Sequence, residues 1–134
     1  MSQDFRYKVT IRESHIDSYG HVNNATYLTL YEEARWELIT PRGYGFHEIH
    51  KIKKGPVILD VNLKFMREIR LRETVEITCE LTDYNGKVGH MLQRILKEDG
   101  SVASEAVFSF GLFDMEARKL IAPTPEWRKA LGLE

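Results

Sequence analysis

The chain has 134 residues, of which 43% are apolar and 29% charged, with a formal net charge of −1. These values fit one globular domain, residues 1–134, and the balanced charge gives no argument for a nucleic-acid partner. No apolar run approaches the roughly 20 residues of a membrane span, and residues 1–6 lack the apolar segment of a signal peptide, so we expect a cytoplasmic protein without a membrane partner.

Changes of hydrophobic period divide the first half of the chain. Residues 5–12 alternate between apolar and polar side chains, which predicts a strand. Residues 13–24 are rich in Ser, Asp, Gly, His and Asn, which indicates a loop. Residues 27–39 then follow a helical period, with Asn23 or Asn24 as the N-cap, and a Pro and a Gly soon afterwards end the helix. The apolar stripe of this helix consists of Tyr27, Leu28, Leu30, Tyr31, Ala34, Leu38 and Ile39.

The second half of the chain is predicted to be mostly strands. Residues 42–56 are predicted as a connecting loop, residues 57–65, 75–82, 87–97 and 101–113 as strands, and residues 126–131 as a short helix. Asn85-Gly86 and Asp99-Gly100 are hairpin turn signals that make the last three strands a meander. The order of elements predicts an α+β fold, with an antiparallel sheet and one helix packed on one face.

The loop before the predicted helix holds the best candidate for a catalytic group, Asp17. A helix start exposes unpaired N–H groups and the positive end of the helix dipole, which favour an anion or a developing oxyanion. Asp17 stands seven residues before Asn24, so a loop that folds back brings its carboxylate to that helix start. This arrangement suits acyl transfer and needs no metal and no cofactor.

The residues alone also leave a structural interpretation open. An Asp in a loop before a helix is more often a turn residue than a catalyst. Gly20 by itself indicates a turn with positive φ, and the two Asn residues by themselves indicate a cap. His21 by itself is more often a hydrogen-bonded structural residue than a base.

A longer motif changes the balance between these interpretations. The chain contains the string Asp17-x-x-Gly20-His21-Val22-Asn23-Asn24-x-x-Tyr27, continuing to Tyr31-Glu32-Glu33-Ala34-Arg35. This string resembles the hotdog-fold thioesterases of the 4-hydroxybenzoyl-CoA thioesterase-like group. The resemblance covers essentially the whole chain and is more specific for the superfamily than for any substrate.

The resemblance implies both a fold and an activity. The fold is a curved antiparallel sheet wrapped around one long central helix, with active sites at a dimer interface in a homodimer or homotetramer. The activity is hydrolysis of an acyl thioester of CoA or of an acyl-carrier protein, with no cofactor other than the CoA of the substrate. The alternative is a hotdog module that binds an acyl group or acyl carrier without turnover. A hotdog dehydratase uses a different local motif that the sequence lacks.

The family's functional residues can be carried over one by one. Its catalytic carboxylate falls on Asp17 and its carbonyl-polarising backbone N–H falls on Asn24. Asp17 acts either as a nucleophile that forms a mixed anhydride or as a general base for water, and the weak basicity of an Asp at neutral pH slightly favours attack. His21 is a rival base that we rank lower. The residues expected to bind substrate are Gly20, His21, Asn23, Tyr27 and Tyr31.

Two further predictions concern the central helix. Some relatives use a helix glutamate in place of the loop aspartate, and Glu33 is the candidate here, although Asp17 makes it unnecessary. Glu32 stands three residues before Arg35, a spacing that lets the two pair on the helix surface.

The acyl and CoA groups of the substrate need sites as well. The acyl pocket is expected between the helix and the sheet beside Phe65, although Phe65 is more simply a core residue. CoA phosphates suit cations, and Lys64 and Arg67 are the chosen contacts, although charge clusters are usually solvated surfaces. The two basic clusters consist of Lys51, Lys53 and Lys54, and of Lys64, Arg67, Arg70 and Arg72.

Overall fold

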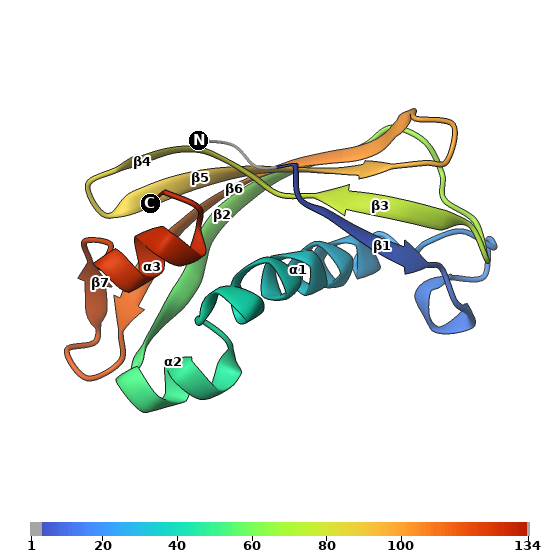
Figure 1. Ribbon diagram of the computed structural model, residues 1–134. Coiled ribbons are helices and arrows are strands. Elements are labelled where there is room, and N and C mark those ends of the chain that lie inside the picture. Colours follow the sequence, from blue (N-terminus) through green and yellow to red (C-terminus); the bar gives the residue numbers. More distant parts are fainter. Residues whose placement is uncertain (1–3, 134) are drawn as a thin grey trace.

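A curved antiparallel sheet packed against one long helix makes up the computed structural model, which describes residues 4–133 (Figure 1). The strands are β1 (Arg6–Thr10), β2 (Lys54–Phe65), β3 (Thr74–Thr78), β4 (Glu80–Asn85), β5 (Val88–Leu96), β6 (Val102–Asp114) and β7 (Lys119–Ile121). The helices are α1 (Thr26–Ile39), α2 (Phe46–Ile52) and α3 (Pro125–Ala130), with 3-10 turns η1 (Glu13–His15) and η2 (Thr40–Arg42). The predicted α+β class is confirmed.

The strands follow the order β1-β3-β5-β6-β2, with β4 also paired to β5 and β7 to β6. The predicted meander is confirmed, because β4, β5 and β6 are consecutive antiparallel neighbours. Gly86 adopts the left-handed φ of 62° that a tight turn between β4 and β5 requires. β2 pairs with β6 along its whole length and, within the described residues, leaves its other edge without a strand neighbour.

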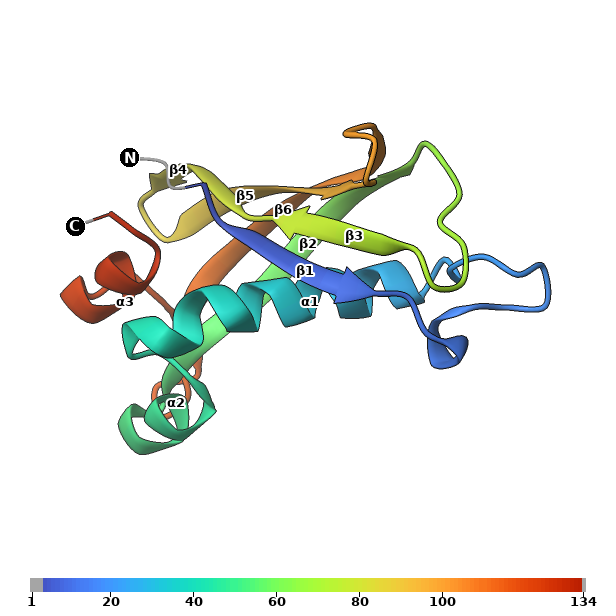
Figure 2. The ribbon, with the colours of Figure 1, turned by 45° about the vertical axis from the view of Figure 1, so that its right-hand side comes forward.

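The helix α1 lies along the concave face of the sheet, with α2 and α3 at one of its ends and the loop that precedes it at the other (Figure 2). Its predicted stripe is buried except for Leu28, which is 42% exposed. A burial stripe covers only the side of a helix that meets the sheet, and Leu28 lies at the margin of that side. No helix within residues 4–133 combines the length and the apolar character needed to cross a membrane.

Three parts of the sequence prediction are corrected by the structure. The predicted 42–56 loop contains the helix α2, in which Ile49 is buried and the other residues are exposed. One buried apolar residue is too few to show a helical period in the sequence. The predicted 75–82 strand is divided into β3 and β4, with Cys79 in neither strand. The sequence pattern does not show this division, because the alternation of side chains continues through Cys79. The short strand β7 was missed because its three residues are too few to show a period.

Candidate active site

The loop between β1 and α1 is a small hairpin that places Asp17 beside His21. The Gly20 N–H donates to the Asp17 carbonyl at 3.0 Å, and the Asp17 N–H donates to the His21 carbonyl at 3.0 Å. Gly20 has a φ of 88°, a left-handed value that strongly favours glycine. A Val22 N–H bond to the Ile69 carbonyl, 2.8 Å long, fixes this hairpin to the connection between β2 and β3.

Asn23 organises the start of α1 without being its N-cap. Its side-chain Oδ1 accepts from the Ala25 N–H at 2.9 Å and its carbonyl accepts from the Thr26 N–H at 2.9 Å. The formal N-cap is Ala25, so the predicted cap at Asn23 or Asn24 is corrected. The Asn24 N–H makes no hydrogen bond within residues 4–133. This donor is therefore available to a ligand at the positive end of the helix dipole.

These two local structures open onto one cleft of about 500 Å³, which we call the Asp17 cleft. It is lined by Asp17, Tyr19, His21, Val22, Asn23, Asn24, Tyr27, Phe65, Met66, Arg67 and Glu68. The structure therefore brings together six of the predicted site residues, among them the carboxylate, the unpaired N–H and one predicted CoA contact. Gly20 shapes the turn behind the cleft without lining it.

Asp17 is held in place and keeps one oxygen available. Its Oδ1 accepts from the Tyr19 N–H at 2.9 Å and lies 3.9 Å from His21 Nδ1. Its Oδ2 makes no hydrogen bond or ion pair within the described part of the chain. The side chain is 22% exposed, so a substrate in the cleft can reach it. A carboxylate fixed through one oxygen and free at the other is oriented for reaction at the free oxygen.

His21 lies between two carboxylates at the edge of the cleft. Its Nδ1 lies 3.9 Å from Asp17 Oδ1, and its Nε2 lies 4.0 Å from Glu68 Oε1. Its ring stacks on Tyr19 with the centroids 5.9 Å apart. The hydrogen bond from Arg70 lowers the pKa of Glu68, so this neighbour of His21 stays charged. These contacts position His21 alongside Asp17.

The aromatic floor of the cleft consists of Tyr27 and Phe65. Their rings meet edge to face with the centroids 4.9 Å apart. Burial raises the pKa of Tyr27, which keeps its hydroxyl protonated. Phe65 is 54% exposed and lines the Asp17 cleft, so its interpretation as a core residue is wrong.

Two predicted site residues lie away from the cleft. Tyr31 is fully buried, and its hydroxyl donates to Ser104 Oγ at 2.7 Å. It stands one helical turn beyond Tyr27 on the same stripe, so its side chain enters the core under the sheet. Lys64 is exposed on β2 and does not line the cleft, because alternation along the strand turns it away from Phe65.

The structure places the charged residues predicted on the central helix outside the Asp17 cleft. Glu33 accepts a hydrogen bond from the Tyr7 hydroxyl at 3.2 Å and lines neither the Asp17 cleft nor its floor. The predicted surface pair of Glu32 and Arg35 is wrong, because Arg35 turns inward. Its Nη1 donates to Gln93 Oε1 at 2.9 Å.

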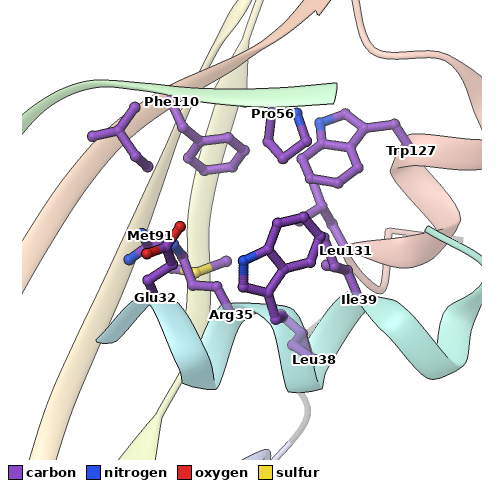
Figure 3. A pocket seen from close by; sticks show the side chains of 11 residues that line it. Glu32, Arg35, Leu38, Ile39, Pro56, Met91, Phe110, Trp127 and Leu131 are labelled. Carbon is purple, nitrogen blue, oxygen red and sulfur yellow. The ribbon is translucent and has the colours of Figure 1, made fainter. Parts of the chain in front are cut away.

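A second cavity, which the sequence did not reveal, lies at the other end of α1 (Figure 3). It measures about 100 Å³, and we call it the α1–α3 cavity. It is lined by Glu32, Arg35, Trp36, Leu38, Ile39, Pro56, Ile58, Met91, Phe110, Trp127 and Leu131. These residues come from α1, β2, β5 and β6 and from α3 and its C-terminal end, so no local sequence pattern predicts the cavity.

The chain resembles known proteins both in sequence and in fold. The model of the thioesterase-like superfamily matches residues 9–131. The chain is 34% identical over 126 residues to the long-chain acyl-CoA thioesterase FadM of Escherichia coli K12, a match covering 92% of this chain and 94% of that protein. The crystal structure of the probable thioesterase YbaW from Escherichia coli superposes with a TM-score of 0.84 and 32% identity, covering 96% of this chain and 97% of that one.

A more distant structure shares the fold. The Staphylococcus aureus protein SAV2348, solved in complex with CoA, superposes with a TM-score of 0.90 at 20% identity, covering 98% of this chain and 84% of that one. The expected hotdog architecture, an antiparallel sheet around a central helix, is confirmed by these superpositions.

Proposed function

Because this chain belongs to the thioesterase-like superfamily and is a thioester hydrolase, we propose that it hydrolyses acyl-CoA thioesters with Asp17 as the acting carboxylate. The observation that carries the proposal is the meeting of the free Asp17 Oδ2 and the unpaired Asn24 N–H in one cleft. FadM, named as an acyl-CoA thioesterase, supports the choice of substrate class.

The start of α1 serves the carbonyl oxygen of the thioester. The Asn24 N–H donates to this oxygen as negative charge develops on it, and the helix dipole adds to the stabilisation. Asn23 contributes by positioning, because its two hydrogen bonds to Ala25 and Thr26 hold the first turn in place. Removing one such donor typically lowers kcat by roughly 10²–10³.

Two routes for Asp17 are compatible with this site. In the first, Oδ2 attacks the carbonyl carbon, the C–S bond breaks, and the thiolate leaves and takes a proton from water. Water then cleaves the mixed anhydride, which releases the acid and regenerates the carboxylate. In the second, Asp17 takes a proton from water as the resulting hydroxide adds to the carbonyl. The C–S bond then breaks, the acid is released, and the leaving thiolate takes the proton from Asp17, which regenerates the carboxylate. Neither route uses a cofactor beyond the CoA of the substrate.

The CoA phosphates are expected near Arg67. Arg67 lines the cleft and is exposed, whereas Arg70 is engaged with Glu68 and Arg72 with Glu13. Arg67 is therefore the cation of its cluster that is best placed to bind a phosphate.

We propose that the protein acts as at least a dimer through the free edge of β2. This edge carries the exposed apolar residues Ile58, Leu59, Val61 and Phe65, followed by Met66. An unpaired apolar strand edge is a template for pairing with a second chain, and an antiparallel β2–β2 pair joins two sheets into one. A two-fold axis near Val61 places the apolar run at the centre of the contact. A monomer at micromolar concentration in a size measurement would contradict this.

The decisive experiment is thiol release from a panel of acyl-CoAs by the wild type and by Asp17→Asn. We expect the variant to lose at least about a thousandfold in kcat, because the amide neither attacks nor accepts a proton. The matched control is Asp83→Asn, which alters a second Asp–His pair, 2.6 Å from His90 Nδ1, on β4 and β5. This control should retain wild-type turnover.

Two outcomes would overturn the proposal. Near wild-type turnover by Asp17→Asn would remove Asp17 from the chemistry. Binding of acyl-CoA by the wild type without thiol release from any CoA or carrier-protein thioester would make the chain a binding module.

A further inference from the structure

Arg35 stands in an unusual environment for a cation. Its guanidinium carbon lies 4.3 Å from the centroid of the Phe108 ring, and its single side-chain hydrogen bond within residues 4–133 goes to Gln93. It forms no ion pair with a carboxylate in that part of the chain. Buried charges are costly unless they are paired, and a guanidinium carries five N–H donors. Most of the N–H donors of the half-buried Arg35 therefore bond to no protein group within residues 4–133.

The position of Arg35 is fixed by a buried network. Gln93 is fully buried, and its Nε2 donates to the Tyr31 carbonyl and to Cys79 Sγ, each at 3.2 Å. Its Oε1 is thereby held where it accepts from Arg35 at 2.9 Å. A donor that is held in this way is organised before a ligand arrives.

The unused donors belong to a residue in the wall of the α1–α3 cavity. Figure 3 shows Arg35 and Glu32 rising from α1 on one side of the cavity, with Phe110 and Trp127 on the opposite side. Apart from these two charged residues, the lining is apolar or aromatic. The volume of about 100 Å³ suits the end of a chain with one polar atom.

We propose that the α1–α3 cavity binds the far end of the acyl group and that Arg35 selects acyl groups with a neutral oxygen there, such as a terminal hydroxyl. A neutral oxygen is favoured over a carboxylate because Glu32 shares the cavity wall and repels a second anion. Glu32 also raises the pKa of Arg35, which partly offsets the lowering by burial and keeps the guanidinium charged.

This inference rests on the proposed function and on the proposed dimer. Within one chain, Ile58 at the cavity and Phe65 at the Asp17 cleft lie seven residues apart along β2, roughly 23 Å in a strand. The buried Tyr31 lies on α1 between Tyr27 of the Asp17 cleft and Arg35 of the cavity. Antiparallel pairing about Val61 instead sets the Asp17 cleft of one copy beside the α1–α3 cavity of the other. The acyl group would thus cross from the carboxylate of one copy into the cavity of its partner.

The test compares chains that differ only in the terminal oxygen. We would measure kcat/KM of the wild type on hexanoyl-, octanoyl- and decanoyl-CoA and on their ω-hydroxy counterparts. At the length that reaches the cavity, we expect the hydroxylated substrate to be preferred by about ten- to hundredfold, the value of a hydrogen bond to a charged donor. The wild-type measurement does not depend on the folding of any variant.

Arg35→Met then tests the origin of the preference. We expect the ratio of hydroxylated to plain substrate to invert, because the hydroxyl would be buried without a partner. Arg35→Lys should restore part of the preference. The matched control, Arg128→Met, removes an exposed cation of α3 and should leave the ratio unchanged.

The outcomes separate this inference from the proposed function. Hydrolysis of plain acyl-CoAs without any preference for the hydroxylated chains would overturn the role of Arg35 and leave the function intact. Absence of thiol release from every substrate would overturn the function itself. A preference that survives Arg35→Met would assign selectivity to another residue and also overturn the inference.

Discussion

The two ends of α1 are built in opposite ways. At its N-terminal end, the Asp17 cleft is open, is the more polar of the two sites and is made largely from residues 17–27 and 65–68. At its C-terminal end, the α1–α3 cavity is small and almost wholly apolar, with walls from five elements. One helix therefore connects two sites of different construction. Its polar end depends on local hydrogen bonds, whereas its apolar end depends on packing between distant segments.

If this division is right, substitutions at the cavity should reduce stability most. Trp127 is 2% exposed, and its ring packs against Tyr44 and Phe110. Trp127→Ala should lower the free energy of unfolding by about 3–5 kcal/mol, measured by urea denaturation. Arg128→Ala, on the exposed side of the same helix, should stay within about 0.5 kcal/mol of wild type. A small effect of Trp127→Ala would mean that packing at the apolar end contributes little to the free energy of unfolding.

A change in the loop should separate activity from stability. Gly20→Ala forces an alanine to a φ of 88° and should cost about 1–2 kcal/mol of unfolding free energy. It should also lower kcat roughly tenfold, because a small displacement of Asp17 is costly to catalysis. Gly86→Ala is the matched control, since Gly86 has a φ of 62° at a turn away from the cleft. It should show a similar stability loss with normal kcat, and equal kcat losses in both variants would contradict the assigned role of the loop.

The turn at the start of α1 offers a sharper version of the same test. Asn23→Ala removes the acceptor of the Ala25 N–H and should cost about 1 kcal/mol of stability. It should also reduce kcat severalfold, because the orientation of the Asn24 N–H depends on this turn. Asp114→Ala removes the same kind of bond, 2.9 Å from the Glu116 N–H, at the turn between β6 and β7. That control should lose stability alone, which parallel denaturation and thiol-release assays would show.

The smallest effect is expected at Arg67, the proposed CoA contact. Arg67→Ala should raise KM for acyl-CoA a few-fold, and the difference from wild type should shrink at high salt as the charge interaction is screened. Lys64→Ala, three residues earlier and outside the cleft, should change KM less. Equal effects of the two substitutions would indicate general attraction by the basic surface instead of a contact at Arg67.

The sequence predicts the polar end of α1 far better than the apolar end, for a physical reason. Asp17, Gly20 and the Asn23 side chain form hydrogen bonds to residues two to four positions away, so their spacing in the chain determines much of their geometry. The turn, the helix start and their meeting in one cleft therefore follow from local pattern and family resemblance.

The parts that could not be predicted depend on tertiary packing. Arg35 has the sequence spacing of a surface partner for Glu32. Its side chain instead turns inward, because it bonds to Gln93 and packs on the ring of Phe108, and both residues are distant in the sequence. Tyr31 and Tyr27 share one stripe, and the curvature of the sheet decides which of them reaches the cleft.

The placement of the tryptophans has a practical consequence. The chain contains two tryptophans, Trp36 and Trp127, and both line the α1–α3 cavity. The tryptophan fluorescence of the protein therefore originates at this one place, far along the helix from Asp17. With selective excitation of tryptophan, the unlabelled protein carries its own optical reporter. Its emission senses the polarity and filling of the cavity, whereas the lining of the Asp17 cleft contains tyrosines instead.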